Sequence, residues 1–375
     1  MFNFKIKKKL KVFVPSTIIE NKTECDLYGF YVKETNIFNV VSSTPQRGLR
    51  KLGFISTKDK INDKNLCGYF ENNDLIFIYK KDKYSVESYS LIQNIFSRNK
   101  GILETDKMIN KRVIIVGCGS VGSLIALELA RSGVGNFMLI DTDIMEYHNV
   151  CRHQCGISDV GEYKVIALKK RILNINPLAK IIVKVSFIEN VKQKDFNDFC
   201  NNYTSIFVGA ADNRKADIYT NRLSAKMNSA FISIGLWERA VVGEIFYWLP
   251  NRNLPCYQCA IGVENTARVE VNNHHVYSSQ VDIEKVKFEP GISIDINFVT
   301  NIGIKLIIDM LNKSDKNYIV RLLNQLQQYT LICNTSNPEI GGKIVEIFSY
   351  PLQVTKSIYV NFGKNCKDKK VCIHE

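Results

Sequence analysis

Short apolar runs alternate with stretches of helical spacing along most of this chain, which is the pattern of an α/β fold built on a parallel sheet. The runs predict strands over residues 113–116, 137–140, 181–185, 205–208, 230–234 and 241–248. Helices are predicted after the first of these strands, over 164–173 and over 292–311. Further strands are predicted over 343–348 and 357–360. The long apolar helix at 292–311 suits a core or a dimer interface better than a membrane span.

The first ninety residues follow a different pattern, in which short apolar runs are separated by Asn, Asp, Gly and Pro. Strands are predicted over residues 11–14, 28–32, 38–41 and 75–79. Residues 88–100 then take on helical spacing. The sequence therefore predicts a small β-rich domain at 1–90, without a catalytic constellation, ahead of a larger domain at 91–375.

A glycine turn between the first strand and helix of the larger domain predicts a nucleotide-binding βαβ unit. Glycines let the backbone turn tightly and approach a ligand, and the start of the helix offers N–H groups and partial positive charge. The second strand ends in Asp141, about twenty residues beyond the glycines, where an acid can hold ribose hydroxyls. The residues of the turn predicted to bind phosphate are Gly117, Gly119, Ser120 and Gly122.

A glycine turn alone would favour a nicotinamide-dependent oxidoreductase, but the residues beyond Asp141 favour a nucleoside triphosphate. Asp143, Asn149, Arg152 and Lys164 follow in close succession. A nicotinamide site has no need of this cluster, whereas a triphosphate needs fixed cations and hydrogen-bond donors. We therefore predict an ATP site.

On these residues the stretch resembles the ThiF/MoeB/HesA adenylating enzymes, relatives of the ubiquitin-activating enzymes. The resemblance runs from about Phe96 to the C-terminus and implies a Rossmann-like α/β domain, whose mostly parallel sheet has an antiparallel extension. Arg152-His153 and residues 290–295 resemble the bacterial branch found beside ubiquitin-like proteins and JAB-type proteases. The two-part division resembles the microcin C peptide-adenylating enzyme. The first hundred residues lack the His-x-His motif of such a protease.

The resemblance also implies roles for individual residues. Arg152 and Lys164 would grip the β- and γ-phosphates of ATP, and Asp212 would hold Mg²⁺; a helix N-cap is the structural alternative for Asp212. Arg98 would reach into the ATP site of a neighbouring subunit of a homodimer, unless it is an ordinary surface arginine. Residues 1–90 would grip the substrate or be purely structural.

Two cysteine pairs predict a structural zinc site. Cys256 and Cys259 form a C-x-x-C motif, which is half of such a site. The family usually supplies a second C-x-x-C near the C-terminus, where this chain has Cys366 and Cys372 with five residues between them. His374 is an alternative fourth ligand, and a remnant without metal is a further alternative.

Residues 262–289 resemble the crossover loop that covers the substrate tail in this family. Some members carry an acceptor cysteine in or near this loop, but this chain has no cysteine between Cys259 and Cys333. A thioester on the loop is therefore excluded. Cys151, Cys155 and Cys333 are left as possible acceptors.

Net charge and cysteine usage indicate the compartment of the protein and the classes of partner that it does not bind. The chain has 375 residues and a net charge of +13, largely from scattered lysines without the aromatic interleaving of a nucleic-acid groove. No segment approaches the ~20 apolar residues of a membrane span, and no secretory signal is evident. Eleven mostly isolated cysteines fit a reducing compartment. We expect a cytoplasmic protein that binds neither nucleic acid nor membrane.

These expectations combine into one function. The chain is expected to be an ATP-dependent adenylyltransferase that activates the C-terminal carboxylate of a ubiquitin-like protein or peptide as an acyl-adenylate. A chain-end carboxyl has a pKa of about 3.5 and is already ionised at neutral pH, so the reaction needs no general base. The alternatives are a microcin-type enzyme of peptide maturation and a catalytically inactive nucleotide-binding scaffold.

Overall fold

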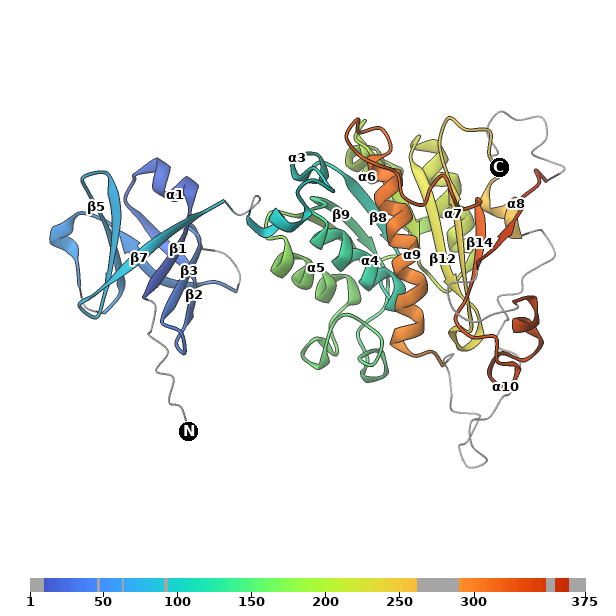
Figure 1. The fold of residues 1–375 in the computed structure, drawn as a ribbon, viewed down its shortest axis with the longest axis horizontal. Helices are drawn as coiled ribbons and strands as arrows, with labels where there is room; N and C mark the ends of the chain where they lie inside the picture. The colour runs from blue at the N-terminus through green and yellow to red at the C-terminus, as the bar shows by residue number, and fades with distance from the viewer. Residues whose placement is uncertain are drawn as a thin grey trace, which may run out of the picture. The chain divides into compact units, whose positions relative to one another are not determined.

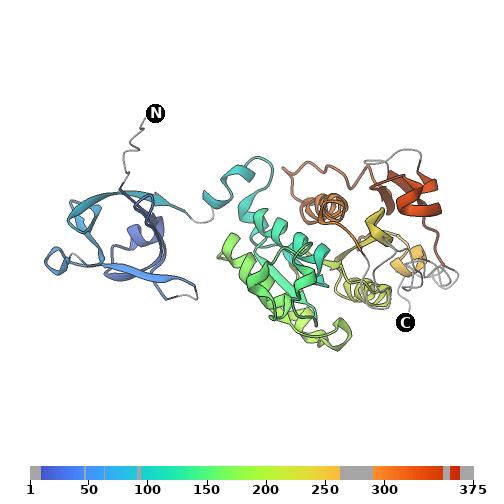
Figure 2. The same ribbon diagram turned by 90° about the horizontal axis from the view of Figure 1, so that it is seen from below.

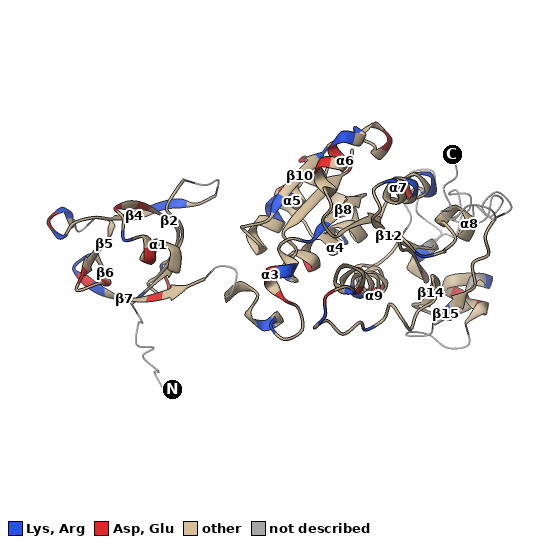
Figure 3. Cartoon of the chain, turned by 90° about the horizontal axis from the view of Figure 1, so that it is seen from above, with Lys and Arg blue, Asp and Glu red and all other residues tan. Residues whose placement is uncertain are grey.

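A computed structural model of the chain describes residues 10–45, 48–62, 64–90, 94–261, 290–348 and 355–363. The chain divides into two compact units, Met1–Arg98 and Asn99–Glu375 (Figure 1). The first unit therefore extends past the boundary expected at residues 90–91. Basic and acidic residues are interspersed on strands, helices and loops of both units (Figure 3).

The N-terminal unit is a closed barrel in the strand order β1-β3-β2-β4-β5-β6-β7, and β7 pairs in parallel with β1 (Figure 1). Leu27, Leu66 and Phe77 are fully buried in its core. The bounds are β1 (Lys11–Pro15), α1 (Ser16–Asn21), β2 (Cys25–Val32), β3 (Ile37–Ser42), β4 (Arg50–Ile55), β5 (Leu66–Glu71), β6 (Asp74–Tyr79) and β7 (Asp82–Tyr89). The four predicted strands are confirmed as β1, β2, β3 and β6.

The helix predicted over residues 88–100 is wrong at its start. Ser88 and Tyr89 end β7, where the Tyr89 hydroxyl donates to the Val40 carbonyl at 2.5 Å across the barrel. Pairing across the barrel thus overrides the local helical spacing. Further along, Ser97–Asn99 form only a short 3-10 helix, η2.

The C-terminal unit is built on an eight-stranded sheet in the order β10-β9-β8-β11-β12-β13-β14-β15. The pairs from β10 to β12 are parallel, and the pairs from β12 to β15 are antiparallel. The bounds are β8 (Arg112–Val116), β9 (Asn136–Ile140), β10 (Lys180–Lys184), β11 (Ser205–Gly209), β12 (Ala230–Leu236), β13 (Val242–Trp248), β14 (Tyr329–Cys333) and β15 (Thr355–Ile358). The expected parallel sheet with an antiparallel extension is confirmed.

Helices cover both faces of this sheet, which explains why its strands are apolar on both sides. Val113 and Ile115 of β8 face one hydrophobic core, and Ile114 and Val116 face the other. The first core contains α4 (Ser120–Arg131), α5 (Lys164–Ile175) and α9 (Ser293–Asn312); the second contains α6 (Gln193–Cys200), α7 (Arg214–Lys226) and α8 (Tyr257–Ile261). Figure 2 shows α9 nearly end-on. No helix in the described ranges, α9 included, is long and apolar enough to cross a membrane.

The strand predicted over residues 343–348 is also wrong. The short helix α10 (Pro338–Gly341) is followed by a 3-10 helix, η8 (Gly342–Ile347). Val345 and Phe348 are buried in the second core. These two apolar residues are three apart, which is the repeat of a 3-10 helix and not the alternation of a strand.

Candidate nucleotide-binding site

The predicted site lies where the carboxyl ends of β8, β9 and β11 meet. Gly117 follows β8, Asp141 follows β9, and residues 210–212 follow β11. The Gly117 N–H donates to the carbonyl of Ile140 at 2.9 Å, at the end of β9. Open parallel sheets bind ligands at this edge, so the fold brings the three segments to the expected place.

The backbone of the glycine turn approaches its neighbours too closely for side chains. Gly117 has a φ of 88°, and a Cβ there would lie 2.6 Å from the Ala210 carbonyl oxygen. A Cβ on Gly122 would lie 1.9 Å from the Gly117 carbonyl oxygen. A Cβ on Gly119 would meet nothing within 4 Å, and no side chain caps the N-terminus of α4. The space before Gly119 and the start of α4 therefore fits an anionic ligand.

Asp141 ties the glycine turn to the loop after β9. Its carboxylate accepts the N–H of Cys118 at 2.6 Å and the N–H of Asp143 at 2.8 Å. A carboxylate has about four acceptor positions. Asp141 can therefore hold the turn in place and still accept ribose hydroxyls.

Lys164 begins α5 and points to the same loop. Its ammonium lies 2.8 Å from the carboxylate of Asp143, and its N–H donates to the Asp143 carbonyl at 2.9 Å. The Lys164 side chain is 11% exposed, whereas that of Asp143 is 61% exposed. The cation is thus fixed on the protein while its partner faces solvent.

The segment that carries Arg152 follows a 3-10 helix, η3 (Tyr147–Asn149). The Asn149 side chain accepts the N–H of Glu146 at 3.0 Å and caps this helix. The Asn149 carbonyl accepts the N–H of Arg152 at 3.0 Å. Asn149 therefore shapes the turn that presents Arg152, which is half-buried.

His153 joins this segment to the glycine turn, a contact that the sequence did not reveal. His153 is buried, with 7% of the residue exposed, and its Nε2 lies 2.7 Å from the Cys118 carbonyl oxygen. Burial lowers the pKa of His153 below its ordinary value. The sequence signal was only a histidine next to Arg152, which says nothing about a partner about 35 residues away.

Asp212 is exposed and lies in the connection from β11 to α7. The N-cap of α7 is Asn213, whose side chain accepts the N–H of Lys215 at 2.9 Å. The alternative that Asp212 caps this helix is therefore wrong. A Cβ on Gly117 would lie 2.6 Å from the N–H nitrogen of Ala211, so the segment of Asp212 adjoins the glycine turn.

A buried network beneath this segment was also missed by the sequence analysis. Glu244 of β13 is 2% exposed and lies 3.2 Å from the guanidinium of Arg214, which begins α7. The same carboxylate oxygen accepts the indole N–H of Trp237 at 2.9 Å and the hydroxyl of Tyr329 at 2.8 Å. Burial and Glu244 raise the pKa of Tyr329. The network fixes the start of α7 to the antiparallel strands.

We expect Glu244→Ala to lower the free energy of unfolding by about 3 kcal/mol, because it leaves the guanidinium of Arg214 buried without its carboxylate. Urea denaturation measures the change. Glu189→Ala, at an exposed glutamate in the same unit, is the control and should shift the free energy by less than about 0.5 kcal/mol. Equal denaturation midpoints for the two variants would show that the network contributes no net stability.

The remaining predicted site residues are not brought to this edge by the described contacts. Arg98 is exposed in η2, and its role in a neighbouring subunit stays a prediction. Cys256 and Cys259 have sulfurs 3.7 Å apart, while Cys366, Cys372 and His374 lie outside the described residues. Among the described residues, no group of three or more His, Cys, Asp or Glu side chains could hold a metal ion.

The possible acceptor cysteines differ in exposure. Cys155 and Cys333 are buried, and burial raises the pKa of the Cys155 thiol to about 12. Cys151 is exposed. Because a thiolate must form and be reached by its substrate, Cys155 and Cys333 are disfavoured.

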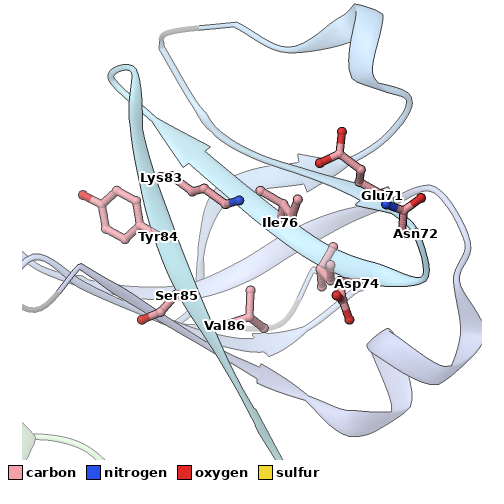
Figure 4. A pocket seen from close by; sticks show the side chains of 9 residues that line it. Glu71, Asn72, Asp74, Ile76, Lys83, Tyr84, Ser85 and Val86 are labelled. Atoms are coloured by element: carbon pink, nitrogen blue, oxygen red, sulfur yellow. The ribbon is translucent and has the colours of Figure 1, made fainter.

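A pocket of about 360 Å³ in the N-terminal barrel is lined by the turn before β6 and by β6 and β7 (Figure 4). Glu71, Asp74 and Lys83 are its charged lining residues. Ser85 also lines the pocket, but its hydroxyl donates to the carbonyl of Leu10 at 2.9 Å and not to a base that could activate it. The pocket therefore supports no catalytic assignment to the barrel.

The fold is a Rossmann-like α/β unit preceded by a β-rich N-terminal unit. The chain belongs to the ThiF family, whose model matches residues 92–340. Members of this family are adenylyltransferase-type enzymes related to the ubiquitin-activating enzymes. The resemblance drawn from the sequence is therefore confirmed.

Among curated proteins, the tRNA threonylcarbamoyladenosine dehydratase of Bacillus subtilis (strain 168) is 41% identical over 110 residues, which are 28% of this chain and 42% of the relative. The ubiquitin-like modifier-activating enzyme 5 of Caenorhabditis elegans is 27% identical over 165 residues, which are 42% of this chain and 39% of the relative. The matches thus span about two fifths of these relatives. Among solved structures, E. coli MccB with ATP has a TM-score of 0.49 and 21% identity, covering 70% of this chain and 68% of that chain.

Proposed function

We propose that this protein is an ATP-dependent adenylyltransferase that activates the C-terminal carboxylate of a ubiquitin-like protein or peptide. The observation that carries the proposal is the gathering of the glycine turn, Asp141, Lys164 and the Arg152 segment at one edge of the sheet. Asp141 and His153 both bond to Cys118. Lys164 pairs with Asp143, whose N–H donates to the carboxylate of Asp141. Family membership supports the same chemistry.

In the proposed reaction a carboxylate oxygen of the substrate attacks the α-phosphorus of ATP. The bond from this phosphorus to the bridging oxygen breaks, and pyrophosphate leaves with the electron pair. The chain's task is to bring two anions together and to spread the charge on the leaving group. The start of α4 and the glycine turn would hold phosphate, and Lys164 and Arg152 would hold the β- and γ-phosphates, near Asn149.

Lys164 suits this task because its ion pair can be exchanged. An ion pair with a largely exposed carboxylate contributes little free energy. A triphosphate, which carries more charge than Asp143, can therefore replace it without moving the fixed ammonium far. Bound Mg²⁺ would neutralise phosphate charge, and the carboxylate of Asp212 would bind the Mg²⁺ ion.

Two finer proposals concern assembly and setting. Arg98 would complete the ATP site of a second copy, so that the enzyme works as a homodimer. Cys25, Cys67, Cys118, Cys151, Cys155 and Cys200 carry thiols that form no disulfide bond, which suits a reducing cytoplasm. A microcin-type peptide substrate is the runner-up to a ubiquitin-like protein.

We also propose a structural zinc ion at Cys256 and Cys259, with Cys366 and Cys372 or His374 completing the site. Two sulfurs bound tetrahedrally at 2.3 Å from zinc lie about 3.8 Å apart, close to the 3.7 Å between these two. The chain also returns to this place, since the N–H of Gly363 donates to the Cys259 sulfur at 3.2 Å.

The zinc proposal predicts one equivalent of zinc per chain in protein purified without chelators, measured by plasma mass spectrometry. Cys259→Ser should reduce the zinc content to less than about a tenth, because thiolate ligands dominate the affinity. Cys25→Ser, a cysteine in the barrel, is the control and should retain the metal. Zinc-free native protein would leave the cysteines as a remnant without metal.

Pyrophosphate release tests the function itself. The protein is incubated with Mg-ATP and a ubiquitin-like protein or short peptide that ends in a free carboxylate, and then with the same molecule bearing a C-terminal amide. Release with the carboxylate and none with the amide is the expected result. Titration with NADH in place of ATP tests the oxidoreductase alternative, and NADH binding without ATP binding would overturn the proposal.

A further inference from the structure

Two hydrogen bonds fasten the segment after Arg152 to the glycine turn and to α4, and a third orders the segment itself. His153 Nε2 lies 2.7 Å from the carbonyl oxygen of Cys118. The N–H of Cys155 donates to His153 Nδ1 at 2.9 Å, and the N–H of Gln154 donates to the hydroxyl of Ser123 at 3.3 Å. Ser123 lies in the first turn of α4 and is fully buried. The segment is therefore docked on the same elements that would hold phosphate.

The partners of His153 define its protonation state. Nδ1 accepts an N–H, so it carries no proton, and the Cys118 carbonyl can only accept, so Nε2 must carry one. Both ring nitrogens are thus used by a neutral imidazole. Burial favours this neutral form and Lys164 acts in the same direction, so the pKa of His153 is lowered, although the hydrogen bond to the Cys118 carbonyl and the carboxylates of Asp141 and Asp159 act against it. Cys118 and Cys155, whose backbone groups bond to the ring, are both buried.

The two peptide groups of Cys118 connect His153 with the predicted ribose-binding acid. The N–H of Cys118 donates to Asp141, and its carbonyl accepts from His153. A shift of the imidazole would therefore move the backbone of Cys118, whose N–H is bonded to Asp141. The segment carrying Arg152 and the glycine turn are linked through one residue.

We propose that His153 is a positioning residue that sets the separation between the glycine turn and Arg152, and so controls how tightly the phosphates of ATP are held. This inference rests on the proposed function, because it needs a triphosphate between the two segments. A proton added to Nδ1 would face the N–H of Cys155 and break that contact. Binding of ATP is therefore expected to weaken as the pH falls below the range in which His153 is neutral.

Substitutions that keep one of the two bonds test the role. His153→Gln keeps a donor for the Cys118 carbonyl, and His153→Asn keeps an acceptor for the Cys155 N–H. Each should weaken binding of Mg-ATP about tenfold in calorimetry at pH 7.5, the size expected for one buried hydrogen bond, and His153→Ala should weaken it further. His148→Gln, at an exposed histidine of the same loop, is the control and should bind as the native chain does. Native affinity in all three His153 variants would overturn the inference.

The native chain gives a second readout that needs no ATP. Long-range ¹H–¹⁵N spectra of protein labelled at its five histidines report the tautomer and the pKa of each ring. His153, identified by the signal lost in His153→Gln, should be the Nε2–H tautomer at pH 7.5 and should take up its proton only below the ordinary pH range of a histidine. An Nδ1–H tautomer, or protonation within the ordinary pH range of a histidine, would overturn the positioning role.

The two readouts also separate this inference from the function on which it rests. A native chain that fails to bind Mg-ATP overturns the proposed function and the positioning role together, whatever the tautomer. A native chain that binds Mg-ATP, while its His153 variants bind equally well, overturns the positioning role alone.

Discussion

Lys164→Ala is expected to reduce ATP–pyrophosphate exchange, measured with a carboxylate substrate, by at least about a hundredfold. The proposed reaction has no general base and depends on fixed positive charge at the departing pyrophosphate. Lys164 supplies that charge from the first residue of α5, with its ammonium fixed 2.8 Å from Asp143. Removing an ion pair whose partner is 61% exposed should cost little stability, less than about 1 kcal/mol.

Lys169→Ala is the matched control, since it removes a lysine from the same helix without touching the predicted phosphate site. It should exchange at the native rate and unfold at the native temperature. Undiminished exchange in Lys164→Ala would refute the role of this lysine. A loss of exchange accompanied by a large drop in the unfolding temperature would instead mark Lys164 as a structural residue.

Asp212→Asn is the second substitution with a large expected effect. It preserves the shape of the side chain but removes the negative charge that would bind Mg²⁺. ATP–pyrophosphate exchange should therefore fall at least about a hundredfold at about 1 mM Mg²⁺, and should recover in part at higher Mg²⁺ concentrations. Because Asn213 and not Asp212 caps α7, the helix should be unaffected.

An exposed aspartate on α6 provides the comparison for this substitution. Asp198→Asn should leave both the exchange rate and its dependence on Mg²⁺ unchanged. Equal magnesium dependence in Asp212→Asn and the native chain would exclude Asp212 as a ligand. Circular dichroism of both variants checks that the fold is retained.

The α/β core and the position of the site follow from local features of the sequence. The features that define the site lie within about thirty residues of chain. They are the β-branched run of β8, Gly117 and Gly122, where a Cβ would clash with the backbone, and Asp141 after β9. Local pattern and final structure agree there, because a βαβ unit is built from consecutive elements. Lys164 is likewise identified by its place at the start of a clearly helical stretch.

Contacts between distant residues could not be obtained in this way. His153 bonds to Cys118 and Glu244 bonds to Tyr329, across 35 and 85 residues of chain. Neither pair shares a helical or strand repeat that would reveal it. The errors at residues 88–89 and 343–348 have the same origin: barrel pairing decides the first, and burial of Val345 and Phe348 decides the second.

In the proposed function, this chain fixes cations around the phosphates of ATP at the carboxyl edge of its parallel sheet. A crystal structure of the protein with ATP and Mg²⁺ tests it most directly. We expect the phosphates at the start of α4, within reach of Arg152 and Lys164, and the ribose at Asp141. Phosphates bound away from Arg152 and Lys164 would contradict it.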